Sequence, residues 1–136
     1  MREIEDGGLT YLWINCIKHC GGEPFIPPYN LQNAWKPILM FYKPPLAVTW
    51  DSIRDTASGG REKDRHPWQQ PEAEANYYID KITVPGSLVC DPCAGAGTTL
   101  AAAKSLGRKW VGIEIDARHV ATARERLAEV TVAGAT

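Results

Sequence analysis

The sequence predicts an α/β protein whose incomplete mixed sheet combines parallel strands with an antiparallel edge pair. Two apolar segments in the first third of the chain have strand composition and are each followed by turn residues. Residues 71–130 instead alternate helix and strand, an order that gives parallel strands joined by right-handed crossovers. At 136 residues the chain has the length of a single small domain, or of part of a larger one.

The antiparallel pair is expected within residues 9–44. The segment Leu9–His19 is rich in Tyr, Trp, Ile and Leu, and Trp35–Tyr42 contains four successive apolar residues. Glycines follow the first segment and prolines follow the second, as is typical of turns. Residues 45–70 then read as a polar loop, because they are rich in turn residues and carry nearly balanced charges.

Residues 71–130 are expected to form helix, strand, helix, strand and helix. Pro71 suits the first turn of a helix, and an apolar stripe follows at helical spacing: Ala75, Tyr78, Ile79 and Ile82. A strand over residues 87–90 leads to Asp91, and a helix is then expected from Thr98 to a glycine cap at Gly107. The second strand, over residues 110–115, contains Glu114.

The last helix is expected to begin after Asp116, which is a suitable N-cap residue. Four apolar side chains share one face of this helix: Val120, Ala123, Leu127 and Val130. Because the two strands are parallel, their carboxyl ends lie at one edge of the sheet, where ligands gather in such folds.

The turn between Asp91 and Thr98 contains Gly95 and Gly97. Glycines at the end of a strand let a ligand approach the backbone, and the following helix offers its unpaired N–H groups. Glu114, 19 residues beyond Gly95, is placed to accept hydrogen bonds from ribose hydroxyls. These features predict a pocket for a nucleoside cofactor.

The chemistry of the turn favours S-adenosylmethionine over a dinucleotide. The dinucleotide fingerprint needs a third glycine where this chain has Leu100, and no lysine follows Gly97 as in a phosphate-binding loop. The carboxylate of Asp91 would repel a pyrophosphate, whereas it suits the ammonium and sulfonium groups of the methyl donor. A nicotinamide-dependent oxidoreductase stays as the alternative.

Three motifs resemble those of the DNA N-methyltransferases, which act on adenine N6 or cytosine N4. Residues 91–99, Asp-Pro-Cys-Ala-Gly-Ala-Gly-Thr-Thr, resemble the family's Asp-Pro-Phe-x-Gly-x-Gly-Thr-Thr. Residues 107–116 resemble its Gly-Arg-x-x-x-Gly-Ile-Glu-x-Asp segment, and residues 66–71 its His-Pro-x-Gln-x-Pro element. The resemblance covers residues 66–127, and residues 9–45 more weakly. It implies a Rossmann-like fold of the S-adenosylmethionine-dependent methyltransferases.

The resemblance also implies the residues that bind the cofactor. Residues 91–99 would surround its methionine and adenosine parts, Glu114 would bind the ribose, and Asp116 would contact the adenine edge or cap the helix. The expected set is His66, Pro67, Gln69, Asp91, Pro92, Cys93, Ala94, Gly95, Gly97, Thr98, Thr99, Glu114 and Asp116. Cys93 departs from the family, which usually has an aromatic ring there.

The residues that would hold the target amine are harder to find. In the family, Asp, Asn or Ser followed by Pro-Pro and an aromatic residue accepts hydrogen bonds from the amine and stacks on the flipped base. Only Ile26-Pro27-Pro28-Tyr29 comes near this pattern, and the aliphatic Ile26 cannot accept a hydrogen bond. A proline turn explains the segment better, so no catalytic residue is assigned and Tyr29 is the single candidate.

The four cysteines allow two other functions. Cys90 and Cys93 form the Cys-x-x-Cys of a redox pair. Cys16 and Cys20 could add two thiolates, and His19 and His66 further ligands, for zinc. The favoured interpretation is that Cys90 is a buried strand residue and Cys93 lines the cofactor turn, without a metal.

The composition of the chain limits which classes of partner are expected. Apolar content of 44% and charged content of 23% are those of a soluble globular protein, and no apolar run or leader pattern indicates a membrane. A cytoplasmic enzyme that acts on DNA is expected. However, the net charge of −1 is low for a DNA-binding protein.

Two further hypotheses remain. The chain could be a non-catalytic cofactor-binding fragment or subunit that needs a complementary chain with the catalytic motif. It could also be an RNA or protein methyltransferase. Within the polar loop, basic side chains could contact DNA phosphates: Arg54, Arg61, Lys63 and Arg65.

Overall fold

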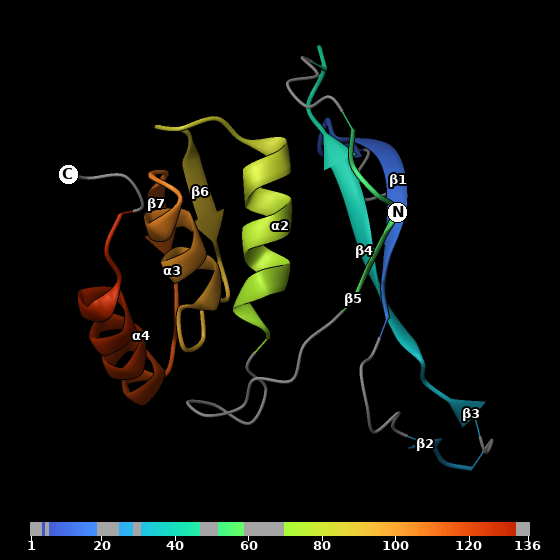
Figure 1. Cartoon of the computed structure of the whole chain (residues 1–136). Coiled ribbons are helices and arrows are strands. Elements are labelled where there is room, and N and C mark those ends of the chain that lie inside the picture. The colour runs from blue at the N-terminus through green and yellow to red at the C-terminus, as the bar shows by residue number, and fades with distance from the viewer. Residues whose placement is uncertain are drawn as a thin grey trace. The chain divides into compact units, whose positions relative to one another are not determined.

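The computed structural model describes residues 4, 6–18, 25–28, 31–46, 52–58 and 70–132. The chain divides into two compact units, Met1–Gly59 and Gly60–Thr136, and the elements of each are labelled in Figure 1. The hydrogen-bonded strands of the described residues form three sheets, two in the first unit and one in the second. None of the described helices has the length and apolar character needed to cross a bilayer.

The first unit is built on β1 (Thr10–Lys18), which lies between two other strands. It pairs antiparallel with β4 (Trp35–Tyr42), so the structure contains an antiparallel pair at the two apolar segments. On its other side β1 pairs in parallel with the short β5 (Thr56–Ser58). The side chain of Ile17, from this central strand, is almost fully buried.

Two features of the first unit differ from the sequence expectation. The segment predicted as a polar loop contains β5, whose three small residues carry no periodic apolar signal. The segment between the two long strands contains a hairpin of β2 (Phe25–Ile26) and β3 (Leu31–Gln32). Strands of two residues are too short to show the alternation that reveals a strand.

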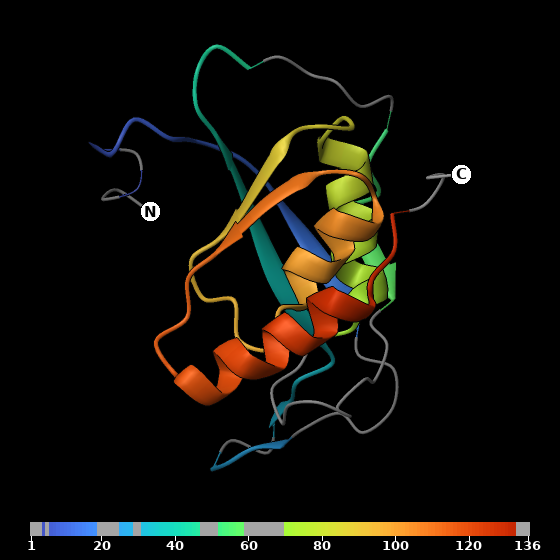
Figure 2. The same cartoon turned by 90° about the vertical axis from the view of Figure 1, so that its left-hand side faces the viewer.

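The second unit runs through α2 (Glu72–Ile82), β6 (Leu88–Asp91), α3 (Thr98–Ser105), β7 (Lys109–Gly112) and α4 (Ala117–Glu129). Strands β6 and β7 are parallel, with α3 as the crossover between them. Figure 2 shows α3 and α4 gathered to one side of the two strands. The element order is therefore the predicted one, with each strand shifted by one residue or shortened.

The core of the second unit is small and rich in alanine. Ala101, Ala102 and Ala103 of α3 are fully buried, and Val89 of β6 packs against a cluster that includes Ile79 of α2. Alanine side chains let a helix approach a sheet closely, because nothing beyond Cβ separates the two backbones. The end of the α2 stripe was predicted wrongly, since Ile82 is exposed.

Buried Arg108 joins the end of α2 to the end of α3. Its Nε donates to Thr83 Oγ1 and its Nη2 to the Thr83 carbonyl oxygen, both at 2.9 Å, and Nη1 donates to the Leu106 carbonyl. Thr83 in turn caps α2 by bonding to the carbonyl of Ile79. The planar guanidinium thus satisfies backbone groups at two helix ends.

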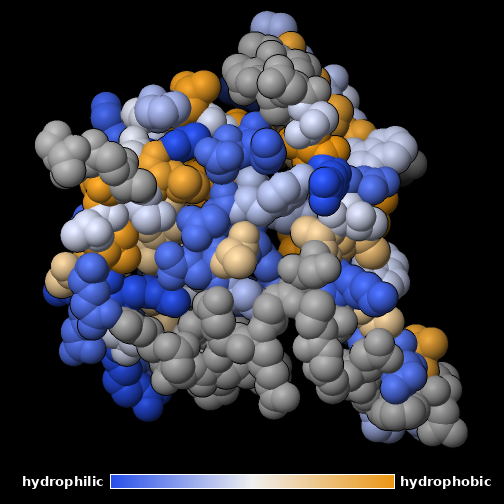
Figure 3. All heavy atoms as spheres, viewed as in Figure 1, coloured by the Kyte–Doolittle hydropathy of each residue, from blue (hydrophilic) through white to orange (hydrophobic). Residues whose placement is uncertain are grey.

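Many large apolar side chains of the described residues are exposed. Figure 3 shows apolar residues lying among charged ones on the face that it draws. In the second unit the exposed set includes Leu88, Trp110, Val111, Ile113 and Ile115. These residues lie on β6, β7 and the segment after β7.

Candidate cofactor-binding site

The site forms at the carboxyl end of β6, where the chain turns into α3. Gly95 and Gly97 both have positive φ angles, +51° and +77°, which glycine adopts readily and other residues do not. A Cβ atom at Gly95 would meet no atom within 4 Å, whereas one at Gly97 would lie 2.9 Å from Ala123 Cβ. Gly95 therefore faces open space, and Gly97 lets α4 pack against the turn.

Asp91 fixes the start of this turn. Its Oδ1 accepts a hydrogen bond from the Cys93 N–H at 3.0 Å, and its backbone oxygen accepts one from Ile113 at 2.9 Å. The Asp91 side chain is half-buried, while Pro92 and Cys93 are exposed. The carboxylate is thus held at the sheet edge, next to two exposed residues of the turn.

Glu114 connects the two strand ends. Its Oε2 accepts from the Gly95 N–H at 2.8 Å, and its Oε1 accepts from the Asp116 N–H at 2.9 Å. The Nδ1 of His119 lies 3.8 Å from Oε1. Glu114 lies beyond β7 and not within a strand as predicted, because the ladder ends when β6 turns away after Asp91.

The hydrogen bonds to Glu114 favour its ionised form. The backbone N–H groups of Asp116 and Gly95 are the main reason why the pKa of this carboxyl lies below its usual value. A carboxylate oxygen has lone pairs for more than one hydrogen bond. Glu114 can therefore hold the glycine turn and still accept bonds from ribose hydroxyls.

Asp116 is a helix cap. Its Oδ1 accepts from the Arg118 backbone N–H at 2.8 Å, and the Arg118 guanidinium Nη2 lies 2.7 Å from Oδ2. The bonds from the Arg118 side chain are the first cause of a pKa well below the usual range for Asp116. The resemblance implied that Asp116 either contacts the adenine edge or caps the helix, and the geometry shows the cap.

Two expected site residues turn their side chains toward the protein interior. Ala94 is buried in a cluster with Leu100 and Leu127, so only its backbone can face a ligand. Thr98 is buried as well, and its Oγ1 accepts a hydrogen bond from Arg126 Nη1 at 2.7 Å. Thr99 is half-buried.

The remaining candidates lie outside the described residues. These are His66, Pro67 and Gln69, expected to close the pocket, and Tyr29, the single catalytic candidate. The same is true of three loop cations that could contact DNA, namely Arg61, Lys63 and Arg65.

Sequence reasoning missed Arg126, which is buried although it is charged. Besides bonding Thr98, it places Nη2 3.5 Å from Glu72 Oε2 and so links α4 to the first turns of α3 and α2. The helical spacing that put Ala123 and Leu127 on one face also put Arg126 beside them. A charged residue gives no apolar signal, so the pattern alone could not reveal its burial.

Gly112 of β7 is a second missed residue. A Cβ at this position would lie 2.4 Å from Leu100 Cδ1 and 3.0 Å from Ala94 Cβ. The close contact between α3 and the neighbouring strand is thus made by a glycine on the strand and a leucine on the helix. In the dinucleotide fingerprint the third glycine, on the helix, provides this contact.

The cysteine expectation was partly wrong. Cys90 is exposed and not buried, because its side chain points to the face of the sheet opposite Val89 and the helices. Cys93 is exposed in the turn. Among the described residues no group of three or more His, Cys, Asp and Glu could hold a metal ion, while Cys20, His19 and His66 lie outside them.

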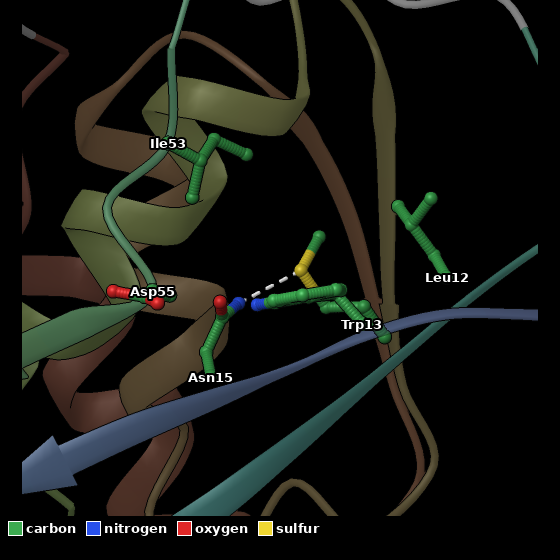
Figure 4. Close-up of a pocket in the computed structure, with 6 residues that line it drawn as sticks. Leu12, Trp13, Asn15, Ile53 and Asp55 are labelled. Atoms are coloured by element: carbon green, nitrogen blue, oxygen red, sulfur yellow. Dashed lines mark hydrogen bonds between the residues drawn. The ribbon is translucent and has the colours of Figure 1, made fainter.

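A separate cavity of about 260 Å³ lies in the first unit, and Figure 4 shows its lining. The Nδ2 of buried Asn15 donates to the Met40 sulfur at 2.8 Å, a weak acceptor. The other lining residues are Leu12, Trp13, Ile53 and Asp55. None belongs to the predicted cofactor set, so the candidate cofactor site at the β6–α3 turn rests on the chemistry of its residues and not on cavity size.

The residues at this turn fit a methyl donor with a nucleoside part. The open space over Gly95 leaves room for a ligand against the backbone. The carboxylate of Asp91 lies on one side and that of Glu114 on the other, joined through the turn. One carboxylate suits a cationic ligand, and the other can accept bonds from a ribose.

Comparison with known proteins identifies the family of this chain. The N6/N4 methyltransferase family, described as DNA methylase, matches residues 29–125, so the chain belongs to this family. Its fold is the Rossmann-like fold of the S-adenosylmethionine-dependent DNA methyltransferases. Among solved structures, the complex of M1.HpyAVI with S-adenosylmethionine has a TM-score of 0.78 at 25% identity, covering 91% of this chain and 65% of that one.

Two curated relatives match the chain more closely over a shorter stretch. The DNA adenine methyltransferase YhdJ of Escherichia coli is 42% identical over 66 residues, which are 48% of this chain and 22% of YhdJ. The type II methyltransferase M.HinfI of Haemophilus influenzae is 40% identical over 68 residues, 50% of this chain and 19% of M.HinfI. The matched stretches thus cover about a fifth of the length of each of these two relatives.

Proposed function

We propose that this chain binds S-adenosylmethionine at the β6–α3 turn and forms the cofactor-binding part of a DNA N-methyltransferase. The product would be a methylated exocyclic amine, at adenine N6 or cytosine N4. The family match supports the class of reaction, and YhdJ, an adenine methyltransferase, is among the relatives.

The observation that carries the proposal is the pair formed by Glu114 and Gly95. The carboxylate bonds the Gly95 N–H while the Cα of Gly95 faces open space. A ribose bound by Glu114 would lie close to this glycine, and a larger side chain there would compete with it for space.

The role of each side chain follows from its position. Glu114 would bind the ribose hydroxyls, and Asp91 would attract the positively charged amino acid part of the cofactor. Cys93, exposed in the turn, would lie near the adenine in place of the aromatic ring usual in the family. The bound cofactor supplies a methyl group on a sulfonium, which an amine can take without a covalent enzyme intermediate.

The same turn fits a dinucleotide less well. The position of the third glycine holds Leu100, which is buried and packs against Gly112. The carboxylate of Asp91 is held at the edge where a pyrophosphate would lie. A titration with NAD or NADP should therefore give no signal.

Transfer requires a group that accepts hydrogen bonds from the target amine. The sequence contains no Asp, Asn or Ser followed by Pro-Pro and an aromatic residue. This observation favours a second candidate function, a cofactor-binding subunit or fragment that acts only with a polypeptide carrying such a motif. DNA would then be a substrate of the assembled enzyme.

Calorimetry and a transfer assay on the same preparation separate these possibilities. We expect S-adenosylmethionine to bind with one-to-one stoichiometry, and unmethylated duplex DNA to gain little or no radioactive methyl group from the chain alone. Efficient transfer by the chain alone would exclude the subunit role. Absence of cofactor binding to a folded chain would exclude both.

A further inference from the structure

Arg126 is a buried cation that connects three helices of the second unit. It lies in the last turn of α4, and its Nη1 donates to Thr98 Oγ1 at 2.7 Å. Its Nη2 lies 3.5 Å from Glu72 Oε2. Thr98 is the first residue of α3 and Glu72 is the first residue of α2. One guanidinium therefore contacts the beginnings of both helices.

Burial of this guanidinium is hard to explain by stability alone. Taking a cation out of water is costly, and an ion pair in a protein interior often stabilises no more than apolar side chains of the same size would. The planar guanidinium does, however, fix the directions of the groups that it binds. These considerations favour a role for Arg126 in setting the geometry of the two helix ends.

The first turn of α3 belongs to the candidate cofactor site. Gly97 has no side chain, so α3 begins without a side-chain cap, and its first turn contains no acidic residue. The N–H groups of Thr98, Thr99 and Leu100 therefore have no partner within the helix. Such groups attract an anion, and the amino acid part of the methyl donor contains a carboxylate.

The ribose end of the site is held by other contacts. Glu114, the proposed ribose acceptor, bonds the N–H groups of Gly95 and Asp116. The contacts of the Arg126 guanidinium instead go to Thr98 and Glu72. Loss of the guanidinium should thus disturb the start of α3 more than the Glu114 carboxylate.

We infer that Arg126 is a positioning residue for the amino acid part of the cofactor, an inference that rests on the proposed function. Through Thr98 it holds the first turn of α3, and with it the N–H groups that would bind the carboxylate. Through Glu72 it connects this turn to α2, which begins shortly after the expected pocket residues 66–69.

Two thioether ligands separate this role from a purely structural one. S-adenosylhomocysteine contains the amino acid part of the cofactor, whereas methylthioadenosine keeps the adenosine and lacks that part. Thr98→Val preserves the shape of the side chain but removes the oxygen that accepts the bond from Arg126. Calorimetry should show that this variant binds S-adenosylhomocysteine about tenfold more weakly and methylthioadenosine less than about twofold more weakly.

Further variants test whether the two side chains act together. Thr98→Ser keeps the acceptor oxygen and should regain most of the affinity lost in Thr98→Val. Arg126→Met should show the same preference between the ligands, and the double variant should bind no more weakly than either single variant, because all three lack the same contact. Arg124→Met, on the exposed side of α4, is the matched control and should leave both affinities unchanged.

The possible results distinguish the inference from the proposed function. Equal weakening of both ligands by Thr98→Val, or no weakening, would overturn the positioning role while the cofactor site remained. Additive losses in the double variant would overturn it too, since the two side chains would then act separately. Failure of the folded original chain to bind either ligand would contradict the proposed function, and the inference with it. Urea unfolding identifies any variant that no longer folds, and if Arg126→Met is one, the two Thr98 variants decide the question.

Discussion

At the scale of single residues, the two glycines of the turn have different physical functions. Gly95 and Gly97 share a positive φ, but only Gly97 touches another element. Replacing either one strains the backbone by roughly 1–2 kcal/mol. Only at Gly97 does a new Cβ also collide with α4, and only at Gly95 does it enter the space assigned to the cofactor.

Gly95→Ala should therefore reduce the affinity for S-adenosylmethionine about tenfold or more while the fold survives with a loss of roughly 1–2 kcal/mol. Gly97→Ala is the matched control, with a larger loss of stability because Ala123 lies 2.9 Å from the new Cβ. Chemical denaturation and calorimetry measure both effects. Equal affinities for the Gly95 variant and the original chain would contradict the assignment.

Glu114→Gln should weaken cofactor binding at least tenfold, because the amide replaces one acceptor oxygen with a donor that faces a backbone N–H. Glu114→Asp keeps the charge but shortens the reach and serves as the comparison. Calorimetry at neutral pH measures both. Full affinity in the Gln variant would remove Glu114 from the ribose site.

The pH dependence of stability gives an independent check on Glu114. Its pKa is lowered in the folded chain, so its stabilising contribution is present above the usual value of 4.5 and is lost as the pH falls below that. The difference in melting temperature between the original chain and Glu114→Gln should thus be constant from pH 6 to 8 and shrink below about pH 4.5. A difference that grows on acidification would contradict the bonding seen here.

At the scale of elements, contacts between different helices and strands hold the second unit together. Leu100 of α3 fits over Gly112 of β7, and Arg108 binds the end of α2. Such contacts depend on which elements become neighbours, which local sequence does not specify.

Gly112→Ala should destabilise the chain by about 1–3 kcal/mol, because its Cβ would lie 2.4 Å from Leu100 Cδ1. The same change made in a Leu100→Ala background should cost less, since the colliding atoms are gone. Urea unfolding of the two single variants and the double variant gives the coupling energy. Additive effects would show that the two residues do not touch.

Arg108→Lys should cost about 1–3 kcal/mol, because an ammonium cannot replace the forked bonds to Thr83. Arg124→Lys, on the exposed face of α4, is a control expected to stay within about 0.5 kcal/mol of the original. Similar stability of the two variants would mean that the Arg108 network contributes little.

The sequence could predict what depends on local chemistry. Asp116 is the N-cap that its residue type suggested, the glycine turn follows β6, and α2, α3 and α4 begin within a residue of the expected positions. Burial was harder to predict. Cys90 looked like a core residue but is exposed, and buried Arg126 was missed, because burial depends on which faces the neighbouring elements cover.

At the scale of the whole molecule, the chain combines a well-formed glycine turn with a small core and exposed apolar strands. The helices cover one face of the β6–β7 sheet, and the other face and one edge are open among the described residues. The stretches that match two curated relatives cover only about a fifth of the length of each.

The most direct measurement is a titration of the purified chain with S-adenosylmethionine, alongside Gly95→Ala and with NAD as the unrelated nucleotide. Our account predicts saturable one-to-one binding, competition by S-adenosylhomocysteine, at least tenfold weaker binding by the variant, and no signal with NAD. If the folded chain bound neither the methyl donor nor its thioether product, the assignment of the β6–α3 turn would be contradicted.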